Sequence, residues 1–362
     1  MTHSQTLVTG FPGLLCREFV RYGAQLTNEG RIVLLTTPAH GGAARDFVAQ
    51  LPAPSASRVT VLEGQLTDLD WGLSGAEVRQ LLDETTHIVH PGGVDLGGRS
   101  ADGHPLRRFR GLLALAPDMP RLQRVCLLST AFVSGNRSGL ILEEDLDAGQ
   151  RLRTPFERSM YELEQIAREM MPRVPITVLR PSAIVGNSQT GDASGLTEGP
   201  KYLLSLMVRL PADIPFFLPG TGVVPFNIVP VDYVVAATWA LAREPSAMGR
   251  TFHLTDPNPM SARQAFDLVA DLMNRSNPFI GTWLGQGIKR ALRATGLARL
   301  LPAQMALLED LTTHVTYCCA GTLECLSSTD IICPPFEAYA DAFIKWLANY
   351  EKSNRAFGDQ TA

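Results

Sequence analysis

A glycine-rich turn follows the first apolar run of the chain and has the spacing of a phosphate-binding loop. The run covers residues 5–9, and a helical pattern begins after the turn Thr9-Gly10-Phe11-Pro12-Gly13-Leu14. Glycines let the backbone turn tightly and approach a pyrophosphate, which the positive end of the following helix attracts. A strand before and a helix after are the context in which this motif predicts dinucleotide binding. Cys16 stands where a third glycine normally allows helix and strand to pack closely.

Two polar side chains stand where predicted strands end. Thr130 follows the apolar run 124–129, and His90 ends the run 87–90. Ligands of open α/β sheets bind at the carboxyl ends of the strands, where a hydroxyl can donate to an oxyanion and an imidazole can accept a proton. Glu157, at the start of a predicted helix, is a further candidate for acid–base chemistry. A buried histidine bonded to the backbone and a solvated glutamate are the alternative interpretations of His90 and Glu157.

Apolar runs alternate with helical patterns over the first half of the chain. The alternation is typical of a parallel sheet with helices on both faces, because parallel strands need crossover connections. We therefore expect an α/β fold with a doubly wound, Rossmann-like parallel sheet over residues 1–186. Residues 187–362 are expected to form mainly a smaller, C-terminal substrate-binding lobe, with some segments returning to the sheet. Strands are predicted over 5–9, 31–36, 58–62, 87–90, 124–129 and 176–180, and helices over 14–27, 43–51, 76–82, 105–115 and 156–171.

The composition excludes several classes of protein. The 362 residues are 45% hydrophobic and 19% charged, as in ordinary globular proteins. The net charge of -4 argues against nucleic acid as a partner, and no apolar run is long enough for a membrane span. None of the six cysteines lies in a Cys-x-x-Cys pair, so no metal site is expected. No targeting segment precedes the first strand, which makes a cytoplasmic location the expectation.

Several segments together resemble the extended short-chain dehydrogenase/reductases, in the branch of fatty acyl-CoA reductases and carrier-protein thioester reductases. The resemblance covers nearly the whole chain and implies a Rossmann-like fold that reduces an acyl thioester with NADPH. Besides the glycine-rich turn, it rests on segments that follow in the family's order, among them Leu128-Ser129-Thr130-Ala131-Phe132-Val133-Ser134-Gly135, Arg180-Pro181-Ser182-Ala183-Ile184-Val185-Gly186 and Asn227-Ile228-Val229-Pro230-Val231-Asp232-Tyr233-Val234.

The family's active constellation is a Ser or Thr, a Tyr and a Lys, and this chain keeps only the first. Thr130 matches the hydroxyl position, but Phe156 stands where the resemblance places the tyrosine and Met160 where it places the lysine. None of the four lysines has a tyrosine four residues before it, so the chain contains no Tyr-x-x-x-Lys pair. A phenyl ring and a thioether can neither move a proton nor hold a ribose hydroxyl by charge. Hydride transfer by the family's mechanism is therefore not expected.

The resemblance also implies cofactor and substrate contacts. Thr36 ends the second strand, where an acidic residue or an arginine would select NAD or NADP, and Gln65 stands where the family usually has an adenine-contacting aspartate. NADP(H) is the cofactor that the resemblance implies, and these replacements predict that its binding is weak or lost. The remaining cofactor contacts are implied at Thr9, Gly10, Phe11, Pro12, Gly13, Leu14, Leu66 and Pro181, and substrate contacts at Arg180, Ser182, Asn187 and Asn227.

Three functions are compatible with these residues. We favour a redox-neutral reaction of an acyl thioester bound to CoA or to an acyl or peptidyl carrier protein, such as cyclisation, condensation, elimination or acyl transfer. Reductase-like domains that lack the tyrosine and close carbon–carbon rings are a relevant precedent. In this hypothesis Thr130 stabilises the oxyanion, and His90 or Glu157 accepts the proton. The alternatives are an unconventional NADPH-dependent thioester reductase and a non-catalytic nucleotide sensor or scaffold.

One further segment could bind a partner. Residues 283–301 form a basic amphipathic pattern, with Lys289, Arg290 and Arg293 interleaved with apolar residues. Such a helix could dock an acidic carrier protein by complementary charge. A solvated helix that covers the acyl pocket explains the pattern nearly as well.

Overall fold

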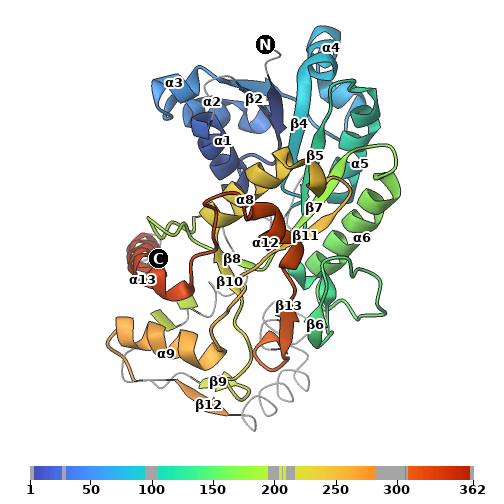
Figure 1. Ribbon diagram of the computed structural model, residues 1–362. Coiled ribbons are helices and arrows are strands. Elements are labelled where there is room, and N and C mark those ends of the chain that lie inside the picture. The colour runs from blue at the N-terminus through green and yellow to red at the C-terminus, as the bar shows by residue number, and fades with distance from the viewer. Residues whose placement is uncertain are drawn as a thin grey trace.

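A seven-stranded sheet forms the centre of the molecule, and every strand pair in it is parallel (Figure 1). The computed structural model describes residues 4–26, 30–93, 105–194, 204–205, 207–208, 217–276, 278–281, 306 and 309–358. The strand order is β11-β7-β5-β4-β1-β2-β3, so the order reverses between β1 and β4. This confirms the predicted doubly wound sheet. The strands are β1 (Gln5–Val8), β2 (Arg31–Thr36), β3 (Val59–Glu63), β4 (Thr85–His90), β5 (Arg124–Leu128), β7 (Ile176–Pro181) and β11 (Thr251–Leu254).

Helices connect these strands, and local signals start several of them. At the start of α4, Ser74 and Glu77 form a capping box in which each side chain accepts from the other's backbone N–H. At the start of α6, Thr154 accepts from the Glu157 N–H at 3.0 Å, and Pro155 takes the first helical position. The helices of this half are α1 (Leu14–Leu26), α2 (Gly41–Ala49), α3 (Ala53–Ala56), α4 (Gly75–Glu84), α5 (Pro105–Leu115) and α6 (Pro155–Met170).

Both faces of the sheet are buried by helices. Ile88 and Val89 are neighbours on β4 and are both fully buried, yet they belong to different cores, because successive strand residues point to opposite faces. Ile88 packs in the core that α5 and α6 cover, and Val89 in the core that α1 and α8 (Val231–Arg243) cover. The continuous apolar strands seen in the sequence follow from this double coverage.

Two elements of the C-terminal half lie on the sheet. The strand β11 pairs with β7, and α8 packs against α1, where Gly23 leaves room for the ring of Trp239. The indole N–H of Trp239 donates to the Phe19 carbonyl at 3.3 Å. These contacts tie residues after 230 to the glycine-rich end of the first helix.

The other elements after the sheet form short strand pairs and helices below it in the view of Figure 1. Every one of these strand pairs is parallel: β8 (Ala183–Val185) with β10 (Ile228–Pro230), β9 (Phe217–Pro219) with β12 (Phe279–Gly281), and β6 (Gly139–Ile141) with β13 (Val315–Tyr317). The helices are α9 (Ala262–Leu272), α12 (Ala320–Leu326) and α13 (Ala340–Gly358). Short 3-10 helices are η1 (Pro38–His40), η2 (Leu69–Gly72), η4 (Ala116–Asp118), η5 (Ala131–Ser134), η6 (Pro245–Ala247) and η8 (Phe336–Ala338).

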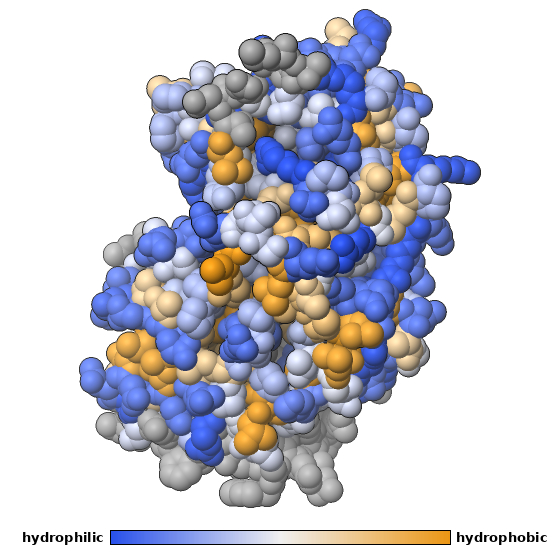
Figure 2. All heavy atoms as spheres, viewed as in Figure 1, coloured by the Kyte–Doolittle hydropathy of each residue, from blue (hydrophilic) through white to orange (hydrophobic). Residues whose placement is uncertain are grey.

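The surface carries its exposed hydrophobic residues in scattered positions. On the face drawn in Figure 2, hydrophobic side chains lie in separate groups among hydrophilic ones. The most exposed large ones, Leu69, Val223 and Ile332, belong to three different segments. Within the described ranges, none of the helices has the length and apolar character needed to cross a membrane.

Candidate active site

The glycine-rich turn has the backbone geometry that its sequence predicts. Gly10 has a φ of +97°, a conformation that favours glycine, and a Cβ added there would lie 3.2 Å from Cγ of Pro91. The Gly13 N–H donates to the Gly10 carbonyl at 3.0 Å and closes the turn just before α1. Cys16 is fully buried in the core between α1 and the sheet. The thiol at the third glycine position is thus accommodated by packing, and the turn is kept.

His90 joins the carboxyl ends of β4 and β1. Its Nδ1 lies 2.8 Å from Oγ1 of Thr9, where the strand order reverses, and its ring stacks on Phe109 with 5.6 Å between the centroids. Burial, with a smaller contribution from the charge of Arg108, lowers the pKa of His90 to about 3. An imidazole with so low a pKa accepts a proton poorly. The structure therefore argues against the expected role of His90 as the general base and favours a structural role at the sheet edge.

The other positions implied for a cofactor lie at or after strand ends. Thr36 is buried, and its Oγ1 has no hydrogen-bond partner among the described residues. The side-chain amide of Gln65 donates to Oγ1 of Thr67 at 2.9 Å, within its own loop. Leu66 is buried, and Pro181 ends β7 beside β11. Of these, Thr36 offers a buried polar atom that a ligand could satisfy.

These residues fit one end of a nicotinamide dinucleotide better than the other. The turn after β1, the N-terminus of α1 and the Thr36 hydroxyl suit a pyrophosphate and a ribose. Arg45, the cation closest in sequence to the end of β2, forms an ion pair with Glu63 instead of lying open for a ribose phosphate. At the other end, the residues at positions 156 and 160 supply no charge for the nicotinamide ribose.

Phe156 and Met160 lie one turn apart on α6 and belong to one apolar core. Met160 is fully buried, and its Cε lies 3.8 Å from where a Cβ of Gly93 would stand. Phe156 is half-buried and packs against the same core. The part of α6 to which the resemblance assigns the tyrosine and the lysine is therefore dry and uncharged. Among the residues that the structure describes, no group of three or more His, Cys, Asp or Glu could hold a metal ion in their place.

Thr130 follows β5 directly and begins η5. It is buried, and its Oγ1 accepts the N–H of Phe132 at 3.3 Å, which leaves the hydroxyl proton available for donation. The neighbouring Ser129 is fully buried, and its Oγ has no partner within the described part of the chain. The carboxyl end of β5 thus holds two hydroxyl groups of the kind that can stabilise an oxyanion.

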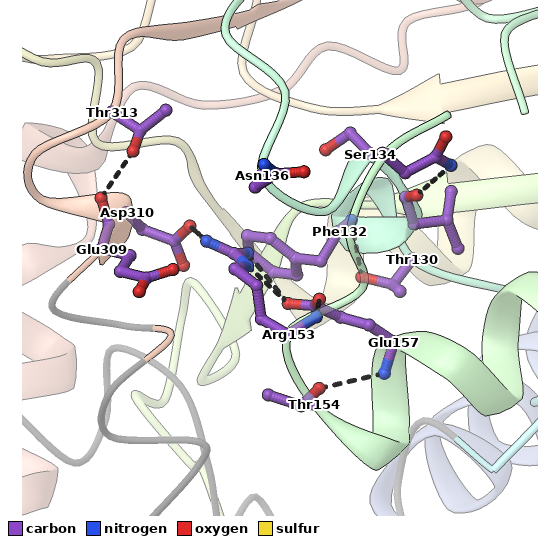
Figure 3. Close-up of polar contacts among 12 residues, drawn as sticks. Thr130, Phe132, Ser134, Asn136, Arg153, Thr154, Glu157, Glu309, Asp310 and Thr313 are labelled. Carbon is purple, nitrogen blue, oxygen red and sulfur yellow. Dashed lines mark hydrogen bonds and ion pairs between the residues drawn. The ribbon is translucent and has the colours of Figure 1, made fainter. Parts of the chain in front are cut away.

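An ion-paired cluster joins the start of α6 to the segment 309–310 (Figure 3). Nε of Arg153 donates to Oε1 of Glu157 at 3.0 Å, and the Arg153 backbone N–H donates to Oε2 at 2.6 Å. Nη1 of Arg153 donates to Oδ1 of Asp310. The side chains of Arg153 and Glu157 are only 6% and 3% exposed. Since Arg153 engages both carboxylate oxygens of Glu157, the structure gives Glu157 a positioning role in place of the expected acid–base role.

The sequence analysis missed two residues of this region. Burial raises the pKa of Asp310 to about 6, although the charge of Arg153 opposes the rise. Tyr317 lies on β13, and its Oη is 3.3 Å from Oγ of Ser134, the last residue of η5. Burial raises the pKa of Tyr317, so the phenol stays protonated. The contact partners are 157 and 183 residues apart in sequence, and no local pattern could have paired them.

Arg180 does not contact a substrate site. Its side chain is fully buried, and its Nε and Nη2 donate to the carboxylate of Glu164 on α6 at 2.9 and 2.6 Å. Nη1 donates to the Glu143 carbonyl at 3.2 Å and lies 3.4 Å from Nε2 of His253. The expectation of a substrate contact is wrong for Arg180, because its charge is consumed in a buried ion pair.

Two more of the predicted substrate residues hold loops together. The amide of Asn227 bonds to both backbone groups of Asp256, at 2.8 and 3.0 Å. Oδ1 of Asn187 accepts the N–H groups of the two residues that follow Ser188, at 2.9 and 3.1 Å. These amides are saturated by the backbone, which corrects their assignment. Ser182 is buried after β7, and no described residue bonds its Oγ, so it stays a candidate.

Known proteins with similar sequences and structures point to one family. The model of the NAD-binding family described as male sterility protein matches residues 8–238. A nonribosomal peptide synthetase of Cladobotryum sp is 30% identical over 166 residues, which are 44% of this chain and 15% of that protein. Another, from Aspergillus hancockii, is 24% identical over 314 residues, which are 79% of this chain and 30% of that protein. The chain therefore spans less than a third of the length of these curated relatives.

A solved structure supports the fold over the whole chain. The terminal R domain from the myxalamid PKS-NRPS biosynthetic pathway superposes with a TM-score of 0.75 at 21% identity. The match covers 97% of this chain and 92% of that domain. At this level of identity the likeness establishes the arrangement of the elements, and the chemistry must be argued from this chain's own residues.

Proposed function

The chain belongs to the male sterility family of NAD-binding proteins and to the thioester-reductase branch of the extended short-chain dehydrogenase/reductases, and from this premise we propose that it carries out redox-neutral substitution at an acyl thioester. In such a reaction a nucleophile replaces the thiol at the carbonyl carbon, as in cyclisation, condensation or acyl transfer. The proposal keeps the substrate class of the branch and departs from its reduction step.

The observation that carries the proposal is the apolar character of α6. Met160 is fully buried, and Phe156 packs on the same core, so this face of the helix offers neither a proton donor nor a cation. A dry surface beside the end of β5 suits an acyl chain better than a nicotinamide ribose. A bound dinucleotide would lie at the turn after β1 and Thr36, and its nicotinamide would supply a hydride. No residue at position 156 or 160 could then protonate the oxygen that reduction leaves.

Thr130 has the main role in the proposed reaction. Attack on the thioester carbonyl places negative charge on oxygen, and a preorganised hydroxyl at the end of β5 stabilises that charge. The N–H of Phe132 already holds Oγ1 of Thr130 at 3.3 Å, so the hydroxyl needs little reorganisation before it donates. The tetrahedral intermediate then collapses, the carbon–sulfur bond breaks, and the thiol leaves without any change of oxidation state.

The relatives favour a carrier-bound substrate. Both curated relatives are nonribosomal peptide synthetases, and the solved neighbour is the terminal R domain of a PKS-NRPS pathway. We propose that this chain also takes its acyl group from the thiol of a carrier protein, in the cytoplasm. The basic pattern expected to dock such a carrier, residues 283–301, lies outside the described residues.

Thiol release with and without a nicotinamide tests the proposal. The purified chain is mixed with octanoyl-N-acetylcysteamine and hydroxylamine as the acyl acceptor, and the free thiol and the acyl hydroxamate are measured above the uncatalysed rate. We expect equal rates with and without NADPH, and a loss of about 10²- to 10³-fold in Thr130→Ala, with recovery in Thr130→Ser. Thiol release that occurs only while NADPH is oxidised would refute redox-neutral chemistry.

Reduction by NADPH is the second candidate, and the intact Gly10 turn favours it. A melting experiment separates the two, because a ligand stabilises the folded state in proportion to its occupancy. We expect octanoyl-CoA to raise the melting temperature more than NADPH at equal concentration. A clear shift with NADPH and none with the thioester would favour the reductase.

A further inference from the structure

The strand β13 brings a phenol to the element that carries Thr130. Tyr317 lies opposite Ile141 in the pairing of β13 with β6. The backbone bonds on both sides are short: the Gly139 N–H donates to His314 at 2.8 Å, and the Cys318 N–H donates to Ile141 at 2.9 Å. The position of Tyr317 is therefore fixed by the sheet ladder and does not depend on a loop.

The hydroxyl of Tyr317 faces η5. Its Oη lies 3.3 Å from Oγ of Ser134, which is 4% exposed, and its ring meets His253 edge-on with 5.4 Å between the centroids. Thr130 caps η5 at its first end and Ser134 is its last residue, so the two hydroxyls belong to one short turn. A phenol that accepts from Ser134 can donate its own proton toward the same place as Thr130.

A carboxylate lies beside this phenol. Asp310 is held by Arg153, whose other contacts fix it to Glu157, and the Asp310 side chain is 33% exposed. The charged groups that face Asp310 are Arg153 and Glu157 from the start of α6 and Glu309 from its own segment. The same charges of Asp310, Arg153 and Glu157 act on Tyr317. Arg153 thus orients one carboxylate oxygen, while two neighbouring carboxylates make Asp310 easier to protonate than an isolated aspartate.

We infer that Tyr317 and Asp310 form the acid–base pair of the thioester reaction, with the phenol as donor to the oxyanion and the carboxylate as proton acceptor. The inference rests on the proposed function. It places the proton chemistry on residues 309–317 and not on α6, where the residues that would normally supply it are Phe156 and Met160.

The step balances without an oxidant or a reductant. Asp310 takes the proton of the nucleophile, and a bond forms between the nucleophile and the carbonyl carbon. The carbonyl electron pair moves to oxygen, which accepts hydrogen bonds from Tyr317 and Thr130. When the carbonyl re-forms, the carbon–sulfur bond breaks, sulfur leaves with the electron pair, and the proton on Asp310 passes to it.

The test uses Tyr317→Phe and Asp310→Asn in the assay with octanoyl-N-acetylcysteamine and hydroxylamine. Tyr317→Phe keeps the ring against His253 and removes only the hydroxyl. Tyr161→Phe is the matched control, because this phenol lies on α6 next to Met160 and bonds only within its own helix, to Gln165 at 3.2 Å. We expect kcat/KM to fall by about 10²-fold or more in both test variants and to stay unchanged in the control.

The pH profile gives a readout that a structural role would not move. If Asp310 is the acceptor, kcat/KM rises with pH up to about 6, where the acid becomes the carboxylate, and then levels off. Asp310→Asn should abolish this limb. Glu309→Gln removes one of the charges that raise the pKa of Asp310, so it should shift the limb to lower pH and leave the plateau in place.

Three outcomes would count against the pair. Wild-type rates in Tyr317→Phe and Asp310→Asn overturn the inference and leave the proposed function standing. Loss of activity in one variant alone overturns the pairing of the two residues. A wild-type protein that releases no thiol without NADPH refutes the proposed function, and the role of Tyr317 and Asp310 falls with it.

Discussion

The buried ion pair between Arg180 and Glu164 allows a sharp test of the corrected role of Arg180. Both side chains are 0% exposed, and the pair joins the last turns of β7 to the middle of α6. Replacing Glu164 by Gln leaves a buried guanidinium without a compensating charge. Breaking a buried pair in this way typically costs about 3–5 kcal/mol, because the remaining charge is not solvated. We therefore expect Glu164→Gln to be strongly destabilised.

The magnitude can be compared with that of the double replacement. Arg180→Met with Glu164→Leu removes both charges and leaves only the Glu143 carbonyl and the His253 ring without their weaker bonds. Each such bond is worth about 1 kcal/mol, so the double variant should lose about 2 kcal/mol at most. At roughly 2–4 °C per kcal/mol for domains of 150–250 residues, the single variant should melt on the order of 10 °C lower than the wild type.

Urea unfolding and thermal melting of the wild type, both single variants and the double variant measure this coupling. Asp341→Asn is the control, because its pair with Lys345 is exposed on α13 and should be worth less than about 1 kcal/mol. A double variant as unstable as the sum of the two singles would refute the reasoning. A folded double variant that no longer turns over thioesters would restore a substrate role for Arg180.

Two further predictions concern packing and pH. In Gly23→Ala the new Cβ would lie 2.1 Å from Cζ2 of Trp239, so unfolding free energy should fall by about 1–3 kcal/mol in urea titrations, whereas Gly42→Ala, with no atom within 4 Å, should change stability by less than 1 kcal/mol; equal effects would show that α1 and α8 are not in close contact. The pKa of His90 is about 3 in the folded chain and near 6.5 when unfolded, so the unfolded chain binds this proton first and stability falls as pH drops below 6.5. His90→Asn should therefore reduce the slope of unfolding free energy between pH 6.5 and 4.5 by up to about 1.4 kcal/mol per pH unit, and an unchanged slope would mean that His90 is charged in the fold.

The strand and helix pattern of the first half could be predicted because each element has a local signature. Six strands and the helices between them appear within a few residues of their predicted bounds. Two later elements of the sheet domain escaped. Helix α8 buries nine of its 13 residues between α1 and the sheet, so it lacks the polar face that reveals a surface helix. Strand β11 has only four residues, too few for a period to show.

The candidate site could be predicted only in part, for a similar reason. The replacements at Phe156 and Met160 were visible because they interrupt a motif of fixed spacing. The partner of a charged residue has no such signature when it lies far away in sequence. Arg180 looked like a substrate contact until Glu164 neutralised it, and Asp310 reaches Arg153 only through the tertiary fold.

The distribution of charge explains how methionine is accommodated at position 160. A lysine there would place an ammonium group in a fully buried apolar core, which costs several kcal/mol unless a partner compensates it. In this chain the nearest organised cation is Arg153, and it is committed to Glu157 on one side and to Asp310 on the other. A cation held by two carboxylates is poorly suited to grip a ribose hydroxyl, but it can hold a carboxylate in place beside Tyr317 and η5. The charge at this site therefore orients proton-transferring groups and not a nicotinamide, as a reaction requires in which the substrate supplies every electron that moves.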